Sequence, residues 1–377
     1  MPILTNFQPI STPFTTLQID GLKWQEQAHV LGGIPTQSNG RKIASLLERF
    51  GCGPAHIEKR GHYLRDFLHF EWGQMEIFRL HENPQGASME VRTAFFQKTV
   101  DQIFENLYSH ENRAPDDLIH VTCTGYVSPS GAQKIVDTKH WYDVTKVTHV
   151  YHMGCYASFP AIRIGNGFLA QSSINDQKRV DIVHTELCTI HLNPTHHTPE
   201  DLVIQSLFAD GAIRYSMVPT SQFHSNDHRG LELIYQHEET VPQSQEAMQW
   251  YLADMNMEMR LSKDVPQLIC KTIHGFLDRL FLKSGLDHIK ERGKAIFAIH
   301  PGGPKIIDKI QIALELNDEQ VSTSKEILKN HGNMSSATIP HVWHHIVNDE
   351  HITVGTVVVS LAFGPGLTIS GAIFRKV

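Results

Sequence analysis

The sequence has no long hydrophobic run, no excess of basic charge and no close pair of cysteines. Polar residues interrupt every apolar stretch, so none approaches the roughly 20 residues that cross a bilayer, and we expect no membrane span. With 33 Lys and Arg against 40 Asp and Glu, the net charge is −7, whereas a nucleic-acid-binding protein needs clustered basic charge. The five cysteines are odd in number and never form CxxC, which is typical of reduced thiols in a cytoplasmic protein.

The chain also lacks a basic, apolar leader at its start and a flexible linker anywhere along its 377 residues. We therefore expect no secretory signal and a cytoplasmic location. The most polar, turn-rich stretch is 221–230, which predicts a boundary between an N-terminal half, 1–220, and a C-terminal half, 221–377. Each half is long enough to bury a core of its own.

Helical and strand patterns alternate along the chain, which predicts an α/β protein with buried mixed sheets. Apolar residues recur every three or four positions in 40–50 and 89–108, which predicts two amphipathic helices. Apolar and β-branched runs predict strands at 117–125, 147–155, 180–188 and 294–303, and a final hairpin around the turn 364–366.

Cys155 lies where one of these strands ends at a Gly and a helix can begin, in the segment VTHVYHMGCYASFPAIRIG. The partial positive charge of a helix N-terminus lowers the pKa of a thiol and increases its thiolate fraction. The sequence therefore predicts a candidate nucleophile, although a free cysteine is also commonly a small buried apolar residue.

Two further turns carry groups that complement a thiol nucleophile. His300 ends an apolar strand and is followed by Pro-Gly-Gly-Pro, and Asn333 lies in a tight turn within HGNMSSATIP. Each residue alone is typical of an ordinary turn. Together with Cys155 they supply a nucleophile, an imidazole and an amide, the groups that thioester chemistry requires.

Seven motifs occur in a fixed order between about residue 115 and the C-terminus, and together they resemble the type III polyketide synthases, the chalcone-synthase-like branch of the thiolase superfamily. They are VTCTGYVSPSG, MGCYAS, IQSLFADGA, KDVPQLI, AIHPGGPKIID, HGNMSSATIP and FGPGLTISG. The resemblance implies a five-layered αβαβα thiolase-like fold made of two similar halves. It also implies a homodimer with a buried site that coenzyme A thioesters reach through a tunnel.

By the same resemblance, Cys155 matches the nucleophile that takes the starter acyl group as a thioester. His300 matches the imidazole that pairs with the thiolate and donates to the thioester carbonyl, and Asn333 matches the second donor. The substrates implied are malonyl-CoA and a starter carried by coenzyme A or an acyl-carrier protein. No metal and no redox cofactor is expected.

Five other residues match positions beside the tunnel. Phe208 matches an aromatic gate between tunnel and cavity, and spacing places Met259 at a second gate position. Lys59 and Arg60 fall near the basic residues that meet the coenzyme A phosphates. Gly302 is expected to lie along the pantetheine arm, because a glycine permits a close approach.

The chain departs from the plant members of this family at several positions. Ser158, Phe159 and Pro160 replace a Gly-Gly pair after the nucleophile, and a proline is tolerated only in the first turn of a helix. Bulky Trp250 and Tyr251 are expected to line the cavity where smaller residues are common. These differences make a chalcone-like product improbable.

Two other patterns compete with this hypothesis. The segment 164–170 fits G-x-G-x-x-A, and Glu186 lies about 20 residues later. A dinucleotide fingerprint follows a strand, whereas this segment follows the start of the helix expected after Cys155. Histidines cluster in 341–345 and 191–197, where a metal-dependent hydrolase is conceivable. A solvated helix face and loop are favoured for both clusters, and the excess of the 25 histidines is expected at surface and turn positions.

The favoured hypothesis is an acyltransferase that extends a starter on Cys155 by decarboxylative Claisen condensation with malonyl-CoA. It would then cyclise the poly-β-keto chain to a pyrone, resorcinol or phloroglucinol type of ring. Two alternatives remain open, a single-condensation enzyme similar to ketoacyl synthase III, and a non-catalytic acyl-binding scaffold with the same fold.

Overall fold

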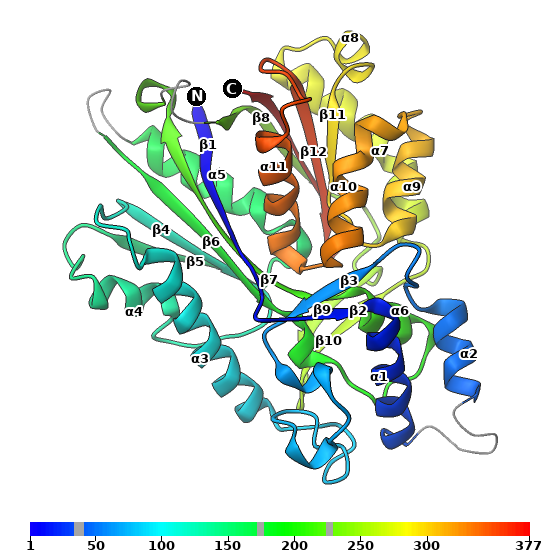
Figure 1. Ribbon diagram of the computed structural model, residues 1–377. Coiled ribbons are helices and arrows are strands. Elements are labelled where there is room, and N and C mark those ends of the chain that lie inside the picture. Colours follow the sequence, from blue (N-terminus) through cyan, green and yellow to red (C-terminus); the bar gives the residue numbers. More distant parts are fainter. Residues whose placement is uncertain (34–40, 172–176, 224–228) are drawn as a thin grey trace.

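A computed structural model of the chain describes residues 1–33, 41–171, 177–223 and 229–377. Its centre is one continuous sheet of nine strands, with helices on both sides and within its bend (Figure 1). In spatial order the strands are β11 (Ile296–Ile299), β12 (Val357–Gly364), β13 (Thr368–Lys376), β8 (Gly230–Thr240), β1 (Pro2–Ile10), β7 (Asp210–Pro219), β6 (Val180–Leu187), β4 (Asp117–Thr122) and β5 (Lys146–Tyr151).

Strand β1 joins two leaves of this sheet. It pairs with β7 along most of its length, but with β8 only at Ile3, Leu4 and Thr5. The first leaf is β5-β4-β6-β7-β1 and the second is β11-β12-β13-β8. The short β1–β8 contact lets the leaves diverge, and two helices fill the space between them (Figure 1).

These two central helices are α5 (Ser158–Ala170) and α11 (Thr338–Asn348). Their side chains share one core with strands of both leaves. The ring of Phe159 in α5 packs edge-on against that of Trp343 in α11, with 5.9 Å between the ring centroids. The outer layers are formed on one side by α3 (Met89–Tyr108) and α4 (Gly131–Thr138), and on the other by α7 (Val265–Ser284), α9 (Pro304–Ala313) and α10 (Asp318–His331). The five-layered α/β arrangement predicted from the sequence is confirmed.

Both faces of the leaves are buried, which explains the nearly continuous apolar strands of the sequence. In β4, Leu118 faces the outer core and Ile119 the central one. In β12, Val358 faces the central helices and Val359 the outer ones. This alternation follows from the two-residue period of a strand.

The predicted amphipathic helices are confirmed as α2 (Arg41–Phe50) and α3, and the predicted hairpin is formed by β12 and β13. Pro160 lies in the first turn of α5, where a backbone N–H would have no acceptor within the helix, so the missing N–H of proline costs no hydrogen bond. The remaining elements are α1 (Gln18–Leu31), α6 (Pro199–Leu207), α8 (His288–Arg292), the pair β2 (Phe14–Leu17) and β3 (Lys59–His62), the pair β9 (Met248–Leu252) and β10 (Met257–Leu261), and six 3-10 turns among the described residues. No helix of the described ranges is long and apolar enough to cross a membrane.

The two leaves repeat one topology. In the first, β1, α3, β4, α4, β5, α5, β6 and β7 follow one another, and in the second β8, α7, β11, α9, α10, α11, β12 and β13 do so. The counterpart of β5 is reduced to an isolated bridge between Phe208 and Asn333. Cys155 before α5 and Asn333 before α11 therefore occupy equivalent places. The predicted boundary after residue 220 stays a prediction.

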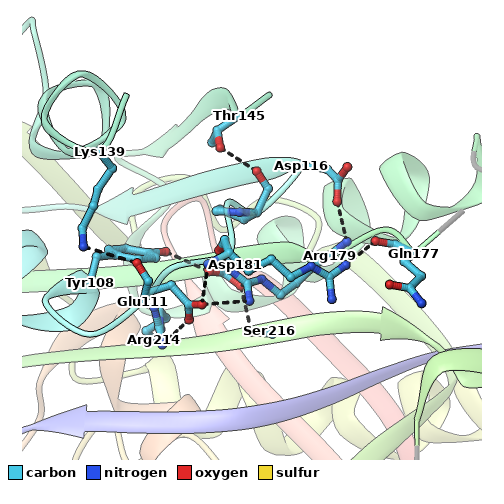
Figure 2. Close-up of polar contacts among 12 residues, drawn as sticks. Tyr108, Glu111, Asp116, Lys139, Thr145, Gln177, Arg179, Asp181, Arg214 and Ser216 are labelled. Atoms are coloured by element: carbon cyan, nitrogen blue, oxygen red, sulfur yellow. Dashed lines mark hydrogen bonds and ion pairs between the residues drawn. The ribbon is translucent and has the colours of Figure 1, made fainter. Parts of the chain in front are cut away.

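A network of charged residues lies at the end of β6 that is remote from these loops (Figure 2). Tyr108 donates to Asp181 at 3.0 Å, and Glu111 bridges Arg179 at 3.5 Å and Arg214 at 3.4 Å. The network ties the end of α3 to the start of β6 and to β7, and so fixes the strand that carries Glu186 at its other end.

Candidate active site

Cys155 lies in a 3-10 turn (Gly154–Tyr156) between β5 and α5 and is 8% exposed. The chain reaches this turn through positive φ angles of 60° at His152 and 77° at Gly154. A Cβ at Gly154 would also come within 2.4 Å of Pro365. Only glycine satisfies both constraints, so this residue sets the position of the thiol.

Asn333 and Ser335 approach Cys155 from the turn before α11. The Ser335 hydroxyl lies 4.0 Å from Cys155 Sγ, and the Asn333 side chain acts on the thiol in the direction that lowers its pKa. The Asn333 Oδ1 atom accepts from the Ser335 N–H at 2.9 Å and from the Thr338 hydroxyl at 3.3 Å. Its carbonyl is thus engaged within its own turn, which leaves the amide N–H as the group that donates into the site.

His300 follows β11, and its backbone N–H pairs with Leu361 of β12 at 2.7 Å. The imidazole is 1% exposed, and neither ring nitrogen has a hydrogen-bond partner within the described residues. Burial lowers the pKa of His300 to about 3, so the ring is neutral. A buried imidazole without a partner is a group that a ligand can satisfy.

The pKa of Cys155 is raised to about 12, by burial first and by the Glu186 carboxylate second, against the opposing hydrogen bonds of Ser335 and Asn333. The sequence predicted a thiol with a lowered pKa at a helix N-terminus, and this prediction is wrong. Removal from water outweighs the helix dipole. The Cys155 thiol is therefore neutral, as is His300.

Glu186, near the end of β6, is a site residue that the sequence did not identify as one. Its fully buried carboxylate accepts from the Cys123 N–H at 3.1 Å, from the Thr124 hydroxyl at 3.0 Å and from both the N–H and the hydroxyl of Ser336. Burial raises the pKa of Glu186 to about 7. The carboxylate joins the loop after β4 to the turn that carries Asn333.

The G-x-G-x-x-A segment that Glu186 would have accompanied lies inside α5, not between a strand and a helix. A Cβ at Gly165 would come within 2.7 Å of the Met217 sulfur, so close helix packing accounts for that glycine. The dinucleotide alternative therefore has no loop on which to bind phosphates.

A cavity of about 900 Å³, a volume that includes the open solvent at its mouth, leads to Cys155. Phe208 and Met259, the predicted gate residues, both line it, as does Trp250. Tyr251 does not belong to this lining and instead bonds to Glu258. The prediction that Tyr251 lines the cavity is wrong, because successive residues of β9 face opposite sides.

Hydrogen bonds hold the cavity wall rigid. The Trp250 indole N–H donates to the Cys123 carbonyl at 2.7 Å. His191, whose ring centre lies 6.1 Å from that of Trp250, accepts from the Met257 N–H through Nδ1 and so donates from Nε2 to the Thr124 carbonyl. This donor pattern fixes the neutral tautomer of His191.

Arg60, one of the two basic residues predicted to meet the coenzyme A phosphates, lines the cavity but is 2% exposed. Its guanidinium donates to the Gln18 side chain and to the Gln205 and Phe208 carbonyls, and so positions Phe208. Its predicted contact with a phosphate stays a prediction.

The roles predicted for Lys59 and Gly302 also stay predictions. Lys59, expected near the coenzyme A phosphates, is exposed. Gly302 lies beside His300, where an added Cβ would make an ordinary 3.6 Å contact with the imidazole. Packing within the protein thus does not demand glycine at this position, and the predicted approach of pantetheine to Gly302 stays a prediction.

The expectation that the surplus histidines lie at surface and turn positions is wrong for part of them. Six besides His300 are buried: His29, His62, His120, His184, His191 and His341. His120, for example, bonds Thr185 at 2.9 Å and Tyr151 at 2.8 Å. Burial lowers its pKa to about 3, and a neutral imidazole offers one donor and one acceptor to such partners. Among the residues that the structure describes, no three His, Cys, Asp or Glu side chains are grouped to hold a metal ion.

Solved structures share this architecture over the whole chain. The crystal structure of the C-terminal type III polyketide synthase domain of Steely1, a type I/III hybrid from Dictyostelium, superposes with a TM-score of 0.83 at 22% identity, covering 100% of this chain and 99% of that one. PKS-I from the brown alga Ectocarpus siliculosus superposes with a TM-score of 0.85 at 19% identity, covering 100% and 98%. The fold is therefore the thiolase-like fold of condensing enzymes.

Sequence comparisons narrow this class. Residues 232–377 match the family of chalcone and stilbene synthases, C-terminal domain. Type III polyketide synthase A of Arabidopsis thaliana is 30% identical over 276 residues, or 70% of this chain and 67% of that protein. Type III polyketide synthase 21 of Oryza sativa subsp. japonica is 28% identical over 265 residues, or 69% and 66%. The chain belongs to the type III polyketide synthase family.

Proposed function

We propose that the protein loads an acyl starter on Cys155, extends it with malonyl-CoA by decarboxylative Claisen condensation and cyclises the product. The observation that carries the proposal is the buried imidazole of His300, whose two nitrogens have no partner among the described residues. A thioester carbonyl or its enolate is the acceptor that such a group lacks.

Loading begins with attack of the Cys155 sulfur on the starter thioester. Because burial keeps the thiol protonated and His300 neutral, attack and proton transfer to the imidazole occur together once the starter fills the cavity. The imidazolium then returns the proton to the departing coenzyme A thiolate. The starter is left as a thioester on Cys155.

Extension requires an enolate from malonyl-CoA. Loss of carbon dioxide leaves the electron pair of the broken C–C bond on the acyl unit, and negative charge develops on the thioester oxygen. The His300 and Asn333 N–H groups stabilise that oxygen, and one such donor contributes about 3–4 kcal/mol in a dry site. The carbanion attacks the acyl-Cys155 carbonyl, the C–S bond to Cys155 breaks and the Cys155 thiolate leaves. The chain, now two carbons longer, is then carried by the coenzyme A of the malonyl-derived unit.

The remaining parts of the proposal concern substrates and assembly. The starter arrives on coenzyme A or an acyl-carrier protein, and the final poly-β-keto chain closes to a pyrone, resorcinol or phloroglucinol type of ring. The reaction needs no metal or redox cofactor, because polarised N–H donors stabilise the charge. We place the enzyme in the cytoplasm as a homodimer.

One alternative enzyme is supported by a specific observation. The bulky Trp250 side chain forms part of the cavity wall next to Cys123, and a bulky wall residue leaves less room for a growing chain, which favours release after few extensions. An enzyme that stops after a single condensation is therefore the second candidate, and the number of added two-carbon units distinguishes the two.

The test is incubation with malonyl-CoA and a panel of acyl-CoA starters, followed by intact-protein and product mass spectrometry. We expect one acyl group on Cys155, none on Cys155→Ala, and released products that carry one or more extension units. Decarboxylation of malonyl-CoA should fall by about two to three decades in His300→Ala and in Asn333→Ala.

Cys270→Ala is the matched control, because Cys270 lies on α7 and its thiol bonds only the Lys309 carbonyl among the described residues. It should load starter like the parent protein. An unacylated parent protein, or an unimpaired Cys155→Ala, would overturn the proposed function and favour the non-catalytic scaffold.

A further inference from the structure

A second thiol, which the proposed mechanism does not use, lies beside the nucleophile. Cys123 follows β4 and Cys155 follows β5, two parallel strands paired at Thr122 and Tyr151. Neighbouring strands lie about 4.8 Å apart, and Cα atoms joined by a disulfide are about 5.5–6 Å apart. Both cysteines line the same cavity, with exposures of 2% and 8%.

A hydrogen bond links Cys123 to the turn that carries Cys155. The N–H of Gly154, the residue immediately before Cys155, donates to Cys123 Sγ at 3.0 Å. The turn that presents the nucleophile thus folds back onto the other sulfur, and one peptide unit separates this contact from Cys155.

Cys188 lines the cavity as well, but among the described residues no hydrogen bond joins it to this turn. Of the three cysteines that line the cavity, Cys123 is the one that accepts a hydrogen bond from the described backbone next to Cys155. This difference makes Cys188 a matched control.

We propose that Cys123 and Cys155 form a reversible disulfide when the protein reacts with hydrogen peroxide in the absence of substrate. The Cys155 sulfur attacks peroxide, the O–O bond breaks, and a sulfenic acid and one water form. The Cys123 sulfur then attacks Cys155, the S–O bond breaks, and the departing hydroxide takes the Cys123 proton as a second water. Two thiols lose two electrons, and the peroxide is reduced to water.

The disulfide protects the nucleophile. A sulfenic acid without a neighbouring thiol proceeds to sulfinic and sulfonic acids, which thiol reductants do not restore. A disulfide is restored by exchange with a dithiol. Loss of synthase activity on oxidation rests on the proposed role of Cys155, whereas formation of the bond does not.

The test treats the substrate-free protein with hydrogen peroxide and reads masses before and after dithiothreitol. We expect the parent protein to lose two hydrogen atoms, to yield a cross-linked peptide pair containing Cys123 and Cys155, and to regain its mass and activity on reduction. Cys123→Ser and Cys123→Ala should instead gain two or three oxygen atoms on Cys155 that dithiothreitol does not remove. Cys188→Ser should lose two hydrogen atoms and yield the same Cys123–Cys155 cross-linked peptide pair as the parent protein.

Thermal melts of the untreated variants establish that they are folded. A cross-link to Cys188, the absence of any cross-link, or full recovery of Cys123→Ser after reduction would overturn the proposal. Because the cross-link is read by mass, a protein that forms it but does not load starter would refute the proposed function alone.

Discussion

Replacing Glu186 with Gln should remove much of the pH dependence of stability. The carboxylate is fully buried, and burial raises its pKa from 4.5 to about 7. The folded protein therefore binds this proton more tightly than the unfolded chain does. Between these two pKa values the folded state holds more protons, so the free energy of unfolding falls as the pH rises.

The magnitude follows from the difference of about 2.5 pKa units, at 1.36 kcal/mol per unit, which gives about 3 kcal/mol in total. Most of this change, about 2–3 kcal/mol, falls between pH 5 and pH 8. Gln also offers only one acceptor oxygen to the N–H groups of Cys123 and Ser336. The variant should thus be less stable than the parent protein at pH 5 by about 1–3 kcal/mol and close to it at pH 8.

Urea unfolding at pH 5 and pH 8 measures both values. Glu315→Gln, which replaces a carboxylate that is 88% exposed, is the control and should leave the difference between the two pH values unchanged. The same pH difference in Glu186→Gln as in the parent protein would refute the reasoning, because the carboxylate would then contribute nothing to it.

Three further substitutions probe the cavity wall and the buried charges. Trp250→Ala should widen the cavity and shift products toward more extension units or larger starters, as read by mass spectrometry. Arg60→Met should lower stability by about 2–5 kcal/mol, because the Phe208 carbonyl loses a buried donor; an unchanged urea midpoint would contradict this. Glu111→Gln should lower the free energy of unfolding by about 1–3 kcal/mol, because Arg214 loses its counter-charge (Figure 2). A loss of stability seen only at low salt would contradict this, because it would indicate a solvent-screened surface pair.

The periodicity of apolar residues was sufficient to predict the helices and strands that bury one or both faces. The predicted helices 40–50 and 89–108 match α2 and α3. The predicted strands 117–125 and 147–155 were too long, because β4 ends at Thr122 and β5 at Tyr151. Beyond these ends, Cys123, Thr124, Gly154 and Cys155 line the cavity, and composition alone does not distinguish such a wall from a strand.

Local pattern likewise located Cys155, His300 and Asn333 at the ends of elements, but it did not reveal what surrounds them. Glu186 receives its donors from residues 63 and 150 positions away in the chain. Arg60 bonds a carbonyl 148 positions away. Such partners are set by the packing of the two leaves, so neither the burial of Arg60 nor the raised pKa of the nucleophile follows from the adjacent sequence.

Burial accounts both for the low charge of the site and for its proposed reactivity. Removal from water raises the pKa of the Cys155 thiol and lowers that of His300, so the site carries few charges before substrate enters. A medium that penalises charge also strengthens each hydrogen bond to a charge that forms within it. Both proposed donors come from the second leaf, His300 after β11 and Asn333 before α11, whereas Cys155 precedes α5 of the first leaf. Glu186 of the first leaf accepts from the Ser336 N–H and so holds the turn that carries Asn333. The charge stabilisation that we propose at Cys155 therefore depends on how the leaves are joined, and the buried Glu186 carboxylate is a polar group that joins them there.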